Sequence, residues 1–100
     1  MAYSHELGVY NFYMDDVQLE KVLKSIANRR RIKILKILKR RPLSVGEIAK
    51  EIKLSFKSTS RHLSILHSSG LIEKEQSALL VFNKPVSRRM KELLQNLSSF

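Results

Sequence analysis

The residues with the most evident chemistry lie in one polar stretch near the middle of the chain. Between Lys53 and Ile72 the sequence has no aspartate or glutamate, while lysine, arginine and serine recur at close intervals. Arginine and lysine bind phosphate oxygens and guanine edges, and serine hydroxyls bind phosphates and bases. A helix that exposes these side chains could bind double-stranded DNA. The alternative is that they form an ordinary solvated face. The candidate DNA-binding residues here are Ser55, Phe56, Lys57, Ser58, Ser60, Arg61 and Ser64.

The overall charge favours an anionic partner. The 100 residues contain 19 Lys and Arg against 9 Asp and Glu, a formal charge of +10 with a pI near 10.2. Such a field attracts DNA, RNA or an anionic membrane surface, and a solubility adaptation is the plainer alternative. No apolar run is long enough to span a bilayer, and residues 1–14 do not read as a secretory signal. Without cysteine there are no disulfides or thiolate ligands, and we expect a cytoplasmic, nucleoid-associated protein.

The polar stretch is expected to form the second helix of a closely joined pair. Its apolar residues recur at helical spacing from Ser55 to Ser69, and Gly70 follows as a stop. A shorter helix over residues 45–52 precedes it, where Ser44 and Glu47 are spaced as a capping box. Two residues form a tight turn between the helices. This arrangement is a helix-turn-helix when the second helix can enter a major groove.

Two further helices are expected before this pair. The first begins near Asp15 and has apolar residues at i, i+3, i+4 and i+7. The second covers residues 29–40, with Asn28 as its N-cap and Pro42 ending it. Its basic run either contacts DNA phosphates, mainly through residues 29–31, or forms a solvated face. The residues expected to point inward from the second helix are Ile32, Leu35 and Leu38, with Ile34 and Ile37 beside them.

After Gly70 the hydrophobic pattern changes to that of strands. Residues 71–76 and 79–84 are predicted to form a hairpin around Ser77 and Ala78. Pro85 breaks the second strand, and a final amphipathic helix covers residues 86–97.

Three segments of the chain resemble the ArsR-type winged-helix regulators. The sequence SIANRRRIKIL at residues 25–35 is similar to their LADPTRLRIL opening, and PLSVGEIA at 42–49 resembles their LSVGELA segment. The sequence LSFKSTSRHLSILHSSGL at 54–71 is similar to their recognition helix, LSQSTVSRHLKVLREAGL. The resemblance implies a winged helix-turn-helix, mainly α, with about five helices and a two-stranded antiparallel wing. This domain would cover residues 15–100, after an N-terminal arm of residues 1–14.

The resemblance further implies a homodimer in which the first and last helices form the subunit interface. An apolar stripe on each terminal helix agrees with this, because a surplus stripe suggests a partner. Two recognition helices would then meet half-sites about 34–36 Å apart. The predicted interface residues are Leu19, Val22, Leu23, Met90, Leu93, Leu94 and Leu97. The arm, with aromatic residues at Tyr3, Tyr10, Phe12 and Tyr13, either packs against a second subunit or frays.

The sequence departs from the family where metal sensing and wing contacts usually reside. Residues 43–49 have no cysteine, and residues 86–100 have no aspartate or histidine, so we expect no metal and no cofactor. His62 and His67 would lie about 140° apart on their helix, and His62 is interpreted as a packed, hydrogen-bonding residue. Arg31 matches an arginine of the family, and it is as well suited to pairing with an acid inside the subunit as to contacting the DNA backbone. The wing is short and flanked by glutamates, so only weak contacts are expected, from Lys74, Gln76 and Ser77.

The leading hypothesis is a sequence-specific regulator of transcription that binds double-stranded DNA as a homodimer. Repression is favoured over activation, because so small a dimer has little surface for contacting polymerase. One alternative is a sequence-neutral nucleic-acid-binding or chromatin protein, and another is a winged helix used for protein association. No residues support an enzyme, since His62 lacks an acidic orienting residue and an oxyanion site.

Overall fold

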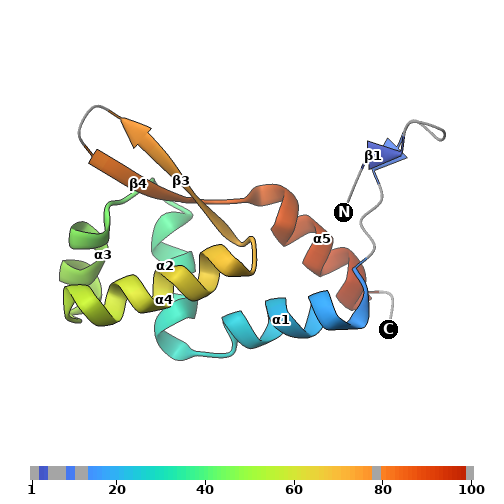
Figure 1. Cartoon of the computed structure of the whole chain (residues 1–100), viewed down its shortest axis with the longest axis horizontal. Coiled ribbons are helices and arrows are strands. Elements are labelled where there is room, and N and C mark those ends of the chain that lie inside the picture. The colour runs from blue at the N-terminus through green and yellow to red at the C-terminus, as the bar shows by residue number, and fades with distance from the viewer. Residues whose placement is uncertain (1–2, 5–8, 11–13, 78–79, 99–100) are drawn as a thin grey trace.

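The computed structural model describes residues 3–4, 9–10, 14–77 and 80–98. In the described chain, five helices surround a core and the hairpin of β3 and β4 extends from it, as the sequence predicts, while a further pair of short strands lies at the N-terminus (Figure 1). The elements are β1 (Tyr3–Ser4), β2 (Val9–Tyr10), α1 (Asp16–Ile26), α2 (Arg29–Leu38), α3 (Val45–Ile52), α4 (Phe56–Ser68), β3 (Ile72–Ser77), β4 (Leu80–Pro85) and α5 (Ser87–Ser98). No described helix combines the length and hydropathy that crossing a bilayer requires.

The first four helices begin at side chains that accept hydrogen bonds from free backbone N–H groups. Asp15 and Ser44 each form a complete capping box, with a Gln and a Glu three residues later. Asn28 caps α2 by accepting from two backbone N–H groups, and Ser55 caps α4 by accepting from the Ser58 N–H. These four starts are confirmed. Helix α2 ends at Leu38, earlier than expected, with Lys39 as its C-cap, and the Arg40 N–H donates to the Ile37 carbonyl at 3.1 Å as the last turn tightens.

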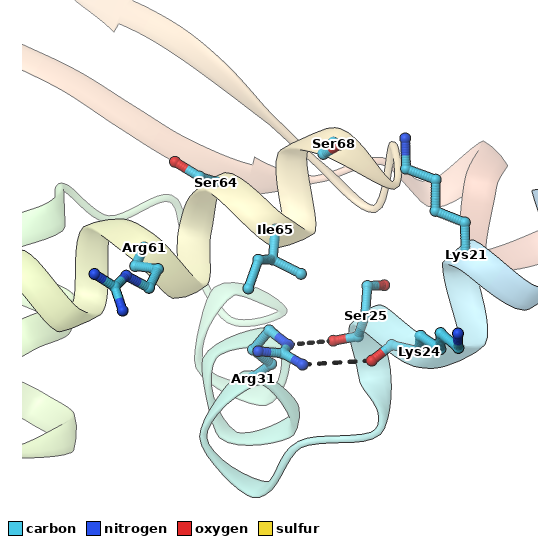
Figure 2. Close-up of a pocket in the computed structure, with 8 residues that line it drawn as sticks. All are labelled: Lys21, Lys24, Ser25, Arg31, Arg61, Ser64, Ile65 and Ser68. Atoms are coloured by element: carbon cyan, nitrogen blue, oxygen red, sulfur yellow. Dashed lines mark hydrogen bonds between the residues drawn. The ribbon is translucent and has the colours of Figure 1, made fainter.

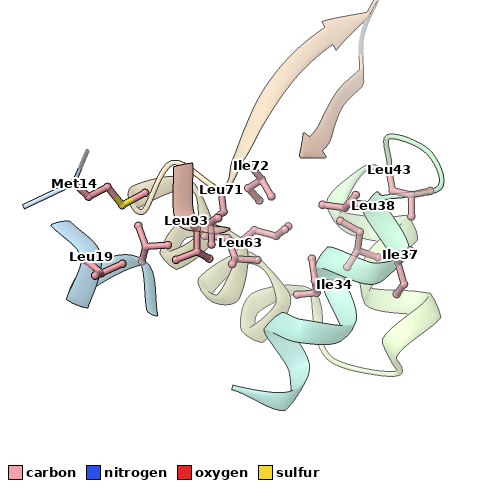
Figure 3. Packing of buried hydrophobic residues seen from close by; sticks show 13 residues of the cluster. Met14, Leu19, Ile34, Ile37, Leu38, Leu43, Leu63, Leu71, Ile72 and Leu93 are labelled. Atoms are coloured by element: carbon pink, nitrogen blue, oxygen red, sulfur yellow. The ribbon is translucent and has the colours of Figure 1, made fainter. Parts of the chain in front are cut away.

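The core lies among the five helices and the base of the β3–β4 hairpin (Figure 3). Helix α4 faces the core with Thr59, Leu63 and Leu66. The aliphatic side chains of the core are close-packed, and the burial of each one stabilises the fold by about 1.5–3 kcal/mol. The largest fully buried side chains are Ile34, Leu38, Leu43, Ile48, Leu66, Leu71, Asn83 and Thr59.

The inward face of α2 differs from the prediction. Ile34, Ile37 and Leu38 are buried, Leu35 is half-buried, and Ile32 is 40% exposed. At 100° per residue Ile32 lies about 200° from Ile34, so the two cannot share a face. Five apolar residues in seven allow two inward faces, and packing against α3 and α4 selects the one centred on Ile34 and Ile37.

Buried Asn83 attaches the hairpin to the helices. Its backbone exchanges hydrogen bonds with Leu43 in the α2–α3 connection, at N–O distances of 3.1 and 2.7 Å. Its side-chain amide donates to the Leu43 carbonyl at 3.1 Å, while Oδ1 lies 2.9 Å from His67 Nε2 on α4. Because Oδ1 only accepts, His67 Nε2 must carry the proton. Asn83 therefore fixes β4 to both α4 and the α2–α3 connection.

Helix α5 returns to the end of α4 through a close contact at Gly70. Gly70 has φ +79°, a left-handed conformation that favours glycine. A Cβ placed there would stand 2.8 Å from Arg89 Nε, so the Arg89 side chain would have to shift. Arg89 in turn donates to buried Glu92 at 2.8 Å, and Arg88 lies 3.4 Å from the other oxygen of Glu92. Glycine at this position therefore serves the turn after α4, and Arg89 of α5 packs against it.

The N-terminal segment differs from the irregular arm expected for residues 1–14. Two short strands pair antiparallel, with Tyr3 opposite Tyr10. Met14 is a core residue, 2% exposed, and its N–H donates to Asn96 Oδ1 on α5 at 3.1 Å. Phe12 and Tyr13 lie outside the described residues, so the predicted role of the aromatic cluster stays a prediction.

Replacing Asn83 tests whether this amide fixes the wing. We expect Asn83→Ala to lower the free energy of unfolding by about 1–3 kcal/mol, because it leaves buried groups of His67 and Leu43 without their partners. Gln76→Ala, at an exposed position on the same hairpin, serves as the control and should change it by less than about 0.5 kcal/mol. Urea unfolding followed by circular dichroism measures both, and equal values for the two variants would contradict the assignment.

Candidate nucleic-acid interface

Helix α4 presents the predicted DNA-binding residues on its open side. Ser60, Arg61 and Ser64 lie three, four and seven residues after Lys57, so the four side chains share one face of the helix. The opposite face holds the buried residues that anchor the helix in the core. Of the candidates on this element, Ser55, Phe56, Lys57, Arg61 and Ser64 are exposed, and Ser58 and Ser60 are half-buried.

The exposed face of α4 keeps its positive charge. Within the described part of the chain, no carboxylate forms an ion pair with Lys57 or Arg61. The helix itself contains no acid, and its N-terminal end adds the partial positive charge of free N–H groups. Phe56 stands at that end with 63% of its surface exposed. The face therefore combines cations, hydroxyls and one apolar ring, the side-chain types that contact phosphates, base edges and thymine methyl groups.

The turn between α3 and α4 uses a left-handed residue that the sequence analysis did not identify. Lys53 caps α3 with φ 57° and ψ 49°, in place of the glycine common at this position. The next N–H, of Leu54, donates to the Ala49 carbonyl at 3.0 Å and closes the turn. A left-handed non-glycine residue costs about 1 kcal/mol. Lys53 keeps this conformation because the turn sets the angle between α3 and α4.

Arg31 joins three helices without a carboxylate, which corrects the expectation of an acidic partner. Its Nε donates to the Ser25 carbonyl at 2.5 Å and its Nη2 to the Lys24 carbonyl at 3.4 Å, both at the end of α1. Its Nη1 lies 3.2 Å from His62 Nδ1 on α4. Because arginine only donates, Nδ1 accepts and the His62 proton lies on Nε2. These contacts, called the Arg31 anchor below, fix α4 relative to α1 and α2.

His62 is neutral in this setting, as a packed hydrogen-bonding residue should be. Burial lowers the pKa of His62 below its usual value, and the charges of Arg31, Arg30 and Arg61 lower it further. The prediction of a packed, hydrogen-bonded His62 is confirmed. Among the residues that the structure describes, no three His, Cys, Asp or Glu side chains gather as a metal site would require.

The wing carries its charges as internal pairs. Lys84 on β4 lies opposite Glu73 in the hairpin register and 3.6 Å from its carboxylate. It also pairs with Glu75 at 2.5 Å. The hydrogen bond and charge of Glu75 raise the pKa of Lys84 above its usual value. The acids on the wing are therefore matched by a local cation.

The three predicted wing contacts are exposed but do not share a face. Lys74 and Gln76 are paired with Asn83 and Val81, so they lie on the side of the hairpin that carries Asn83. Ser77 lies on the other side, because successive residues of a strand alternate. A groove of DNA could thus contact either Ser77 or the two residues Lys74 and Gln76, but not all three. The tip of the wing, residues 78–79, lies outside the described residues.

The predicted interface residues divide between the core and the surface. Leu19, Val22 and Leu93 are buried in the subunit's own core, so little of their surface is left for a partner. Met90 is half-buried and packs against the same core. The large apolar side chains that remain exposed on α1 and α5 are those of Leu23 (37% exposed), Leu94 (63%), Leu97 (37%) and Val17 (76%). Val17 was not among the predicted interface residues. An apolar stripe alone does not separate core from interface.

Comparison with known proteins places this geometry in a family. The model of the "bacterial regulatory protein, arsR family" matches residues 28–74, from the cap of α2 into the first wing strand. A protein named transcriptional activator HlyU, from Vibrio cholerae serotype O1, is 37% identical over 76 residues, 76% of this chain and 70% of that protein.

Solved structures agree with this sequence relationship. Reduced HlyU from Vibrio cholerae N16961 superposes with a TM-score of 0.66 at 35% identity, over 83% of this chain and 90% of that chain. A winged helix-turn-helix DNA-binding domain of Mb0332 from Mycobacterium bovis, described as homodimeric, superposes with a TM-score of 0.70 at 27% identity, over 83% and 80%. The winged helix-turn-helix predicted from the sequence is thereby confirmed. With a relative of this identity covering more than two thirds of both chains, the chain belongs to the ArsR family of bacterial regulatory proteins.

Proposed function

We propose that this protein binds double-stranded DNA sequence-specifically, as a homodimer with α4 in the major groove, and regulates transcription in the bacterial cytoplasm. The single observation that carries the proposal is the acid-free, exposed face of α4. Lys57 and Arg61 on this face have no carboxylate partner in the described chain, and Ser60 and Ser64 lie between and beside them. Family membership adds support, because its members are regulatory proteins.

The proposed dimer interface consists of the apolar side chains left exposed on α1 and α5. These helices contact each other in one subunit (Figure 1), and Leu23, Leu94 and Leu97 are the exposed leucines that they carry. The Mycobacterium bovis relative is described as homodimeric. A two-fold pair would present two α4 helices to half-sites about one helical turn apart.

For the direction of regulation we propose repression, by occupancy of a promoter. A small DNA-binding domain blocks polymerase simply by covering its site, which requires no further contact surface. The Vibrio cholerae relative is named an activator. Transcription in vitro from a promoter carrying the selected site decides the direction, since a fall in transcript supports repression and a rise overturns it.

Selection from a random duplex library tests sequence specificity. We expect an enriched motif with two-fold symmetry and half-sites about 10 base pairs apart. Recovery of sequences without any motif would instead assign sequence-neutral coating, which the charge of +10 also favours. Failure to retain duplex DNA at low salt would overturn DNA binding altogether.

Arg61→Ala is expected to weaken binding to the selected duplex by about 1–3 kcal/mol, because a base-reading arginine loses two hydrogen bonds. Fluorescence anisotropy measures the affinity, and selection with the variant shows whether preference is relaxed at one position. Lys36→Ala, an exposed cation on α2, is the control and should keep the preferred sequence unchanged. An Arg61→Ala variant with full affinity would contradict the placement of α4.

Phe56 and Lys57 stand side by side at the start of α4 and should affect binding differently. We expect Phe56→Ala to relax a preference for thymine without changing the salt dependence, because its ring would contact a thymine methyl group. Lys57→Gln should lower the slope of log affinity against log salt by about one unit without changing sequence preference. Affinities measured from low to high salt on the selected duplex and on single-base variants separate these outcomes, and an identical response of the two variants would refute the assignment.

Leu94→Glu should convert the dimer into monomers, because it places a charge in the proposed apolar interface. Size-exclusion chromatography with light scattering measures the mass, and DNA affinity should fall with it. Val81→Glu is the matched control, since Val81 is an exposed apolar residue on the wing, 41% exposed. An unchanged mass for Leu94→Glu would exclude this face as the dimer interface.

A further inference from the structure

A basic groove lies between α1, the start of α2 and α4, beside the proposed DNA-binding face (Figure 2). Its volume is about 460 Å³. Four cations, three hydroxyls and one aliphatic side chain surround it, and none of the described residues that line it is a carboxylate. The lining residues are Lys21, Lys24, Ser25, Arg31, Arg61, Ser64, Ile65 and Ser68.

The deeper part of the basic groove is rigid. Arg31 is half-buried and its guanidinium is fixed by two carbonyls of α1 and by His62. Ser25 is 3% exposed, and its hydroxyl donates to the Val22 carbonyl at 2.7 Å and lies 3.0 Å from the Ser69 hydroxyl. These contacts hold the end of α1 against α4. The groove is therefore formed by the fold itself, without any movement of side chains on the surface.

The rim of the basic groove carries exposed cations whose charge is scarcely neutralised by neighbouring acids. Lys21, Lys24 and Arg61 are exposed. In the described chain an acid reaches this rim at Glu20, whose carboxylate lies 3.9 Å from Lys24 Nζ, and both side chains are largely exposed. Such a surface pair is worth at most about 1 kcal/mol, so it leaves the groove strongly positive.

The shape and chemistry of the basic groove suit a small phosphorylated molecule. Ammonium and guanidinium groups bind phosphate oxygens as charge-assisted donors. Its volume lies within the range of about 300–1,000 Å³ found for small-molecule sites. A straight duplex is convex and could touch rim residues such as Arg61, but it could not fill a recess whose floor is half-buried Arg31.

We infer that the basic groove binds a small molecule carrying at least two phosphate charges, and that this ligand weakens DNA binding. The second part rests on the proposed function. Arg61 lies in the lining of the groove and on the exposed face of α4 at once, so one guanidinium serves both anions. Binding of the ligand and binding of DNA therefore oppose each other by the same factor.

Titration of inorganic pyrophosphate into the full chain without DNA tests the site. Calorimetry gives the affinity, and amide shifts in nuclear magnetic resonance spectra should centre on residues 24–25 and 64–68. We expect the double variant Lys21→Gln and Lys24→Gln to bind pyrophosphate about tenfold more weakly, because two rim cations are lost. Lys36→Gln with Lys39→Gln removes the same charge at exposed positions outside the groove and should stay within about twofold. Equal losses in both double variants would show unspecific attraction and overturn the site.

Competition with DNA tests the regulatory part at constant ionic strength. Replacing sodium chloride by pyrophosphate should weaken binding of the wild-type chain to the selected duplex. The same replacement should have a much smaller effect on the double variant Lys21→Gln and Lys24→Gln. If pyrophosphate does not bind while that variant loses DNA affinity and salt dependence, the groove contacts the DNA backbone and the inference is overturned. The proposed function would survive that result, since it fails only if duplex DNA is not bound or selection finds no motif.

Discussion

The Arg31 anchor is the interaction on which the rest of the molecule depends. One guanidinium satisfies two carbonyls at the end of α1 and the Nδ1 of His62 on α4. Because all three partners are neutral, the anchor sets the position of α4 without cancelling the charge of Arg31. A carboxylate partner would have served the fold equally well but would have placed a negative charge beside the DNA-binding face. The same interaction therefore positions the helix, holds His62 neutral and leaves the basic groove positive.

The wing follows a different principle, in which polar groups are satisfied internally. Asn83 is fully bonded to Leu43 and His67, and Lys84 is shared between two glutamates. This fixes the angle of the hairpin relative to α4 but leaves little net charge on it. Attraction to phosphate must then arise from the helices, so specificity depends on α4 more than on the wing.

Local signals in the sequence predicted the elements well, and long-range choices were predicted less well. The starts of the first four helices could be predicted because a cap such as Ser44 acts within three residues of chain, and Gly70 was identified because its turn is local. The inward face of α2 was wrong at Ile32, since packing partners distant in sequence select among adjacent apolar residues. Leu93 was assigned to the interface because an apolar stripe carries no sign of whether its partner is the same chain. The carbonyl partners of Arg31 leave no pattern in the sequence at all.

The distribution of the few acids explains how a stable fold retains so basic a surface. Within the described chain, Asp15 and Glu47 cap helices, and Glu92 holds two arginines of α5 from a buried position. Glu73 and Glu75 are matched by a cation on the wing. Each of these carboxylates acts on a backbone N–H or a cation close to it in the chain or the hairpin, and none lies on α4. The positive field is thus concentrated where α2 and α4 meet, and both the DNA-binding face and the basic groove arise from this one asymmetry.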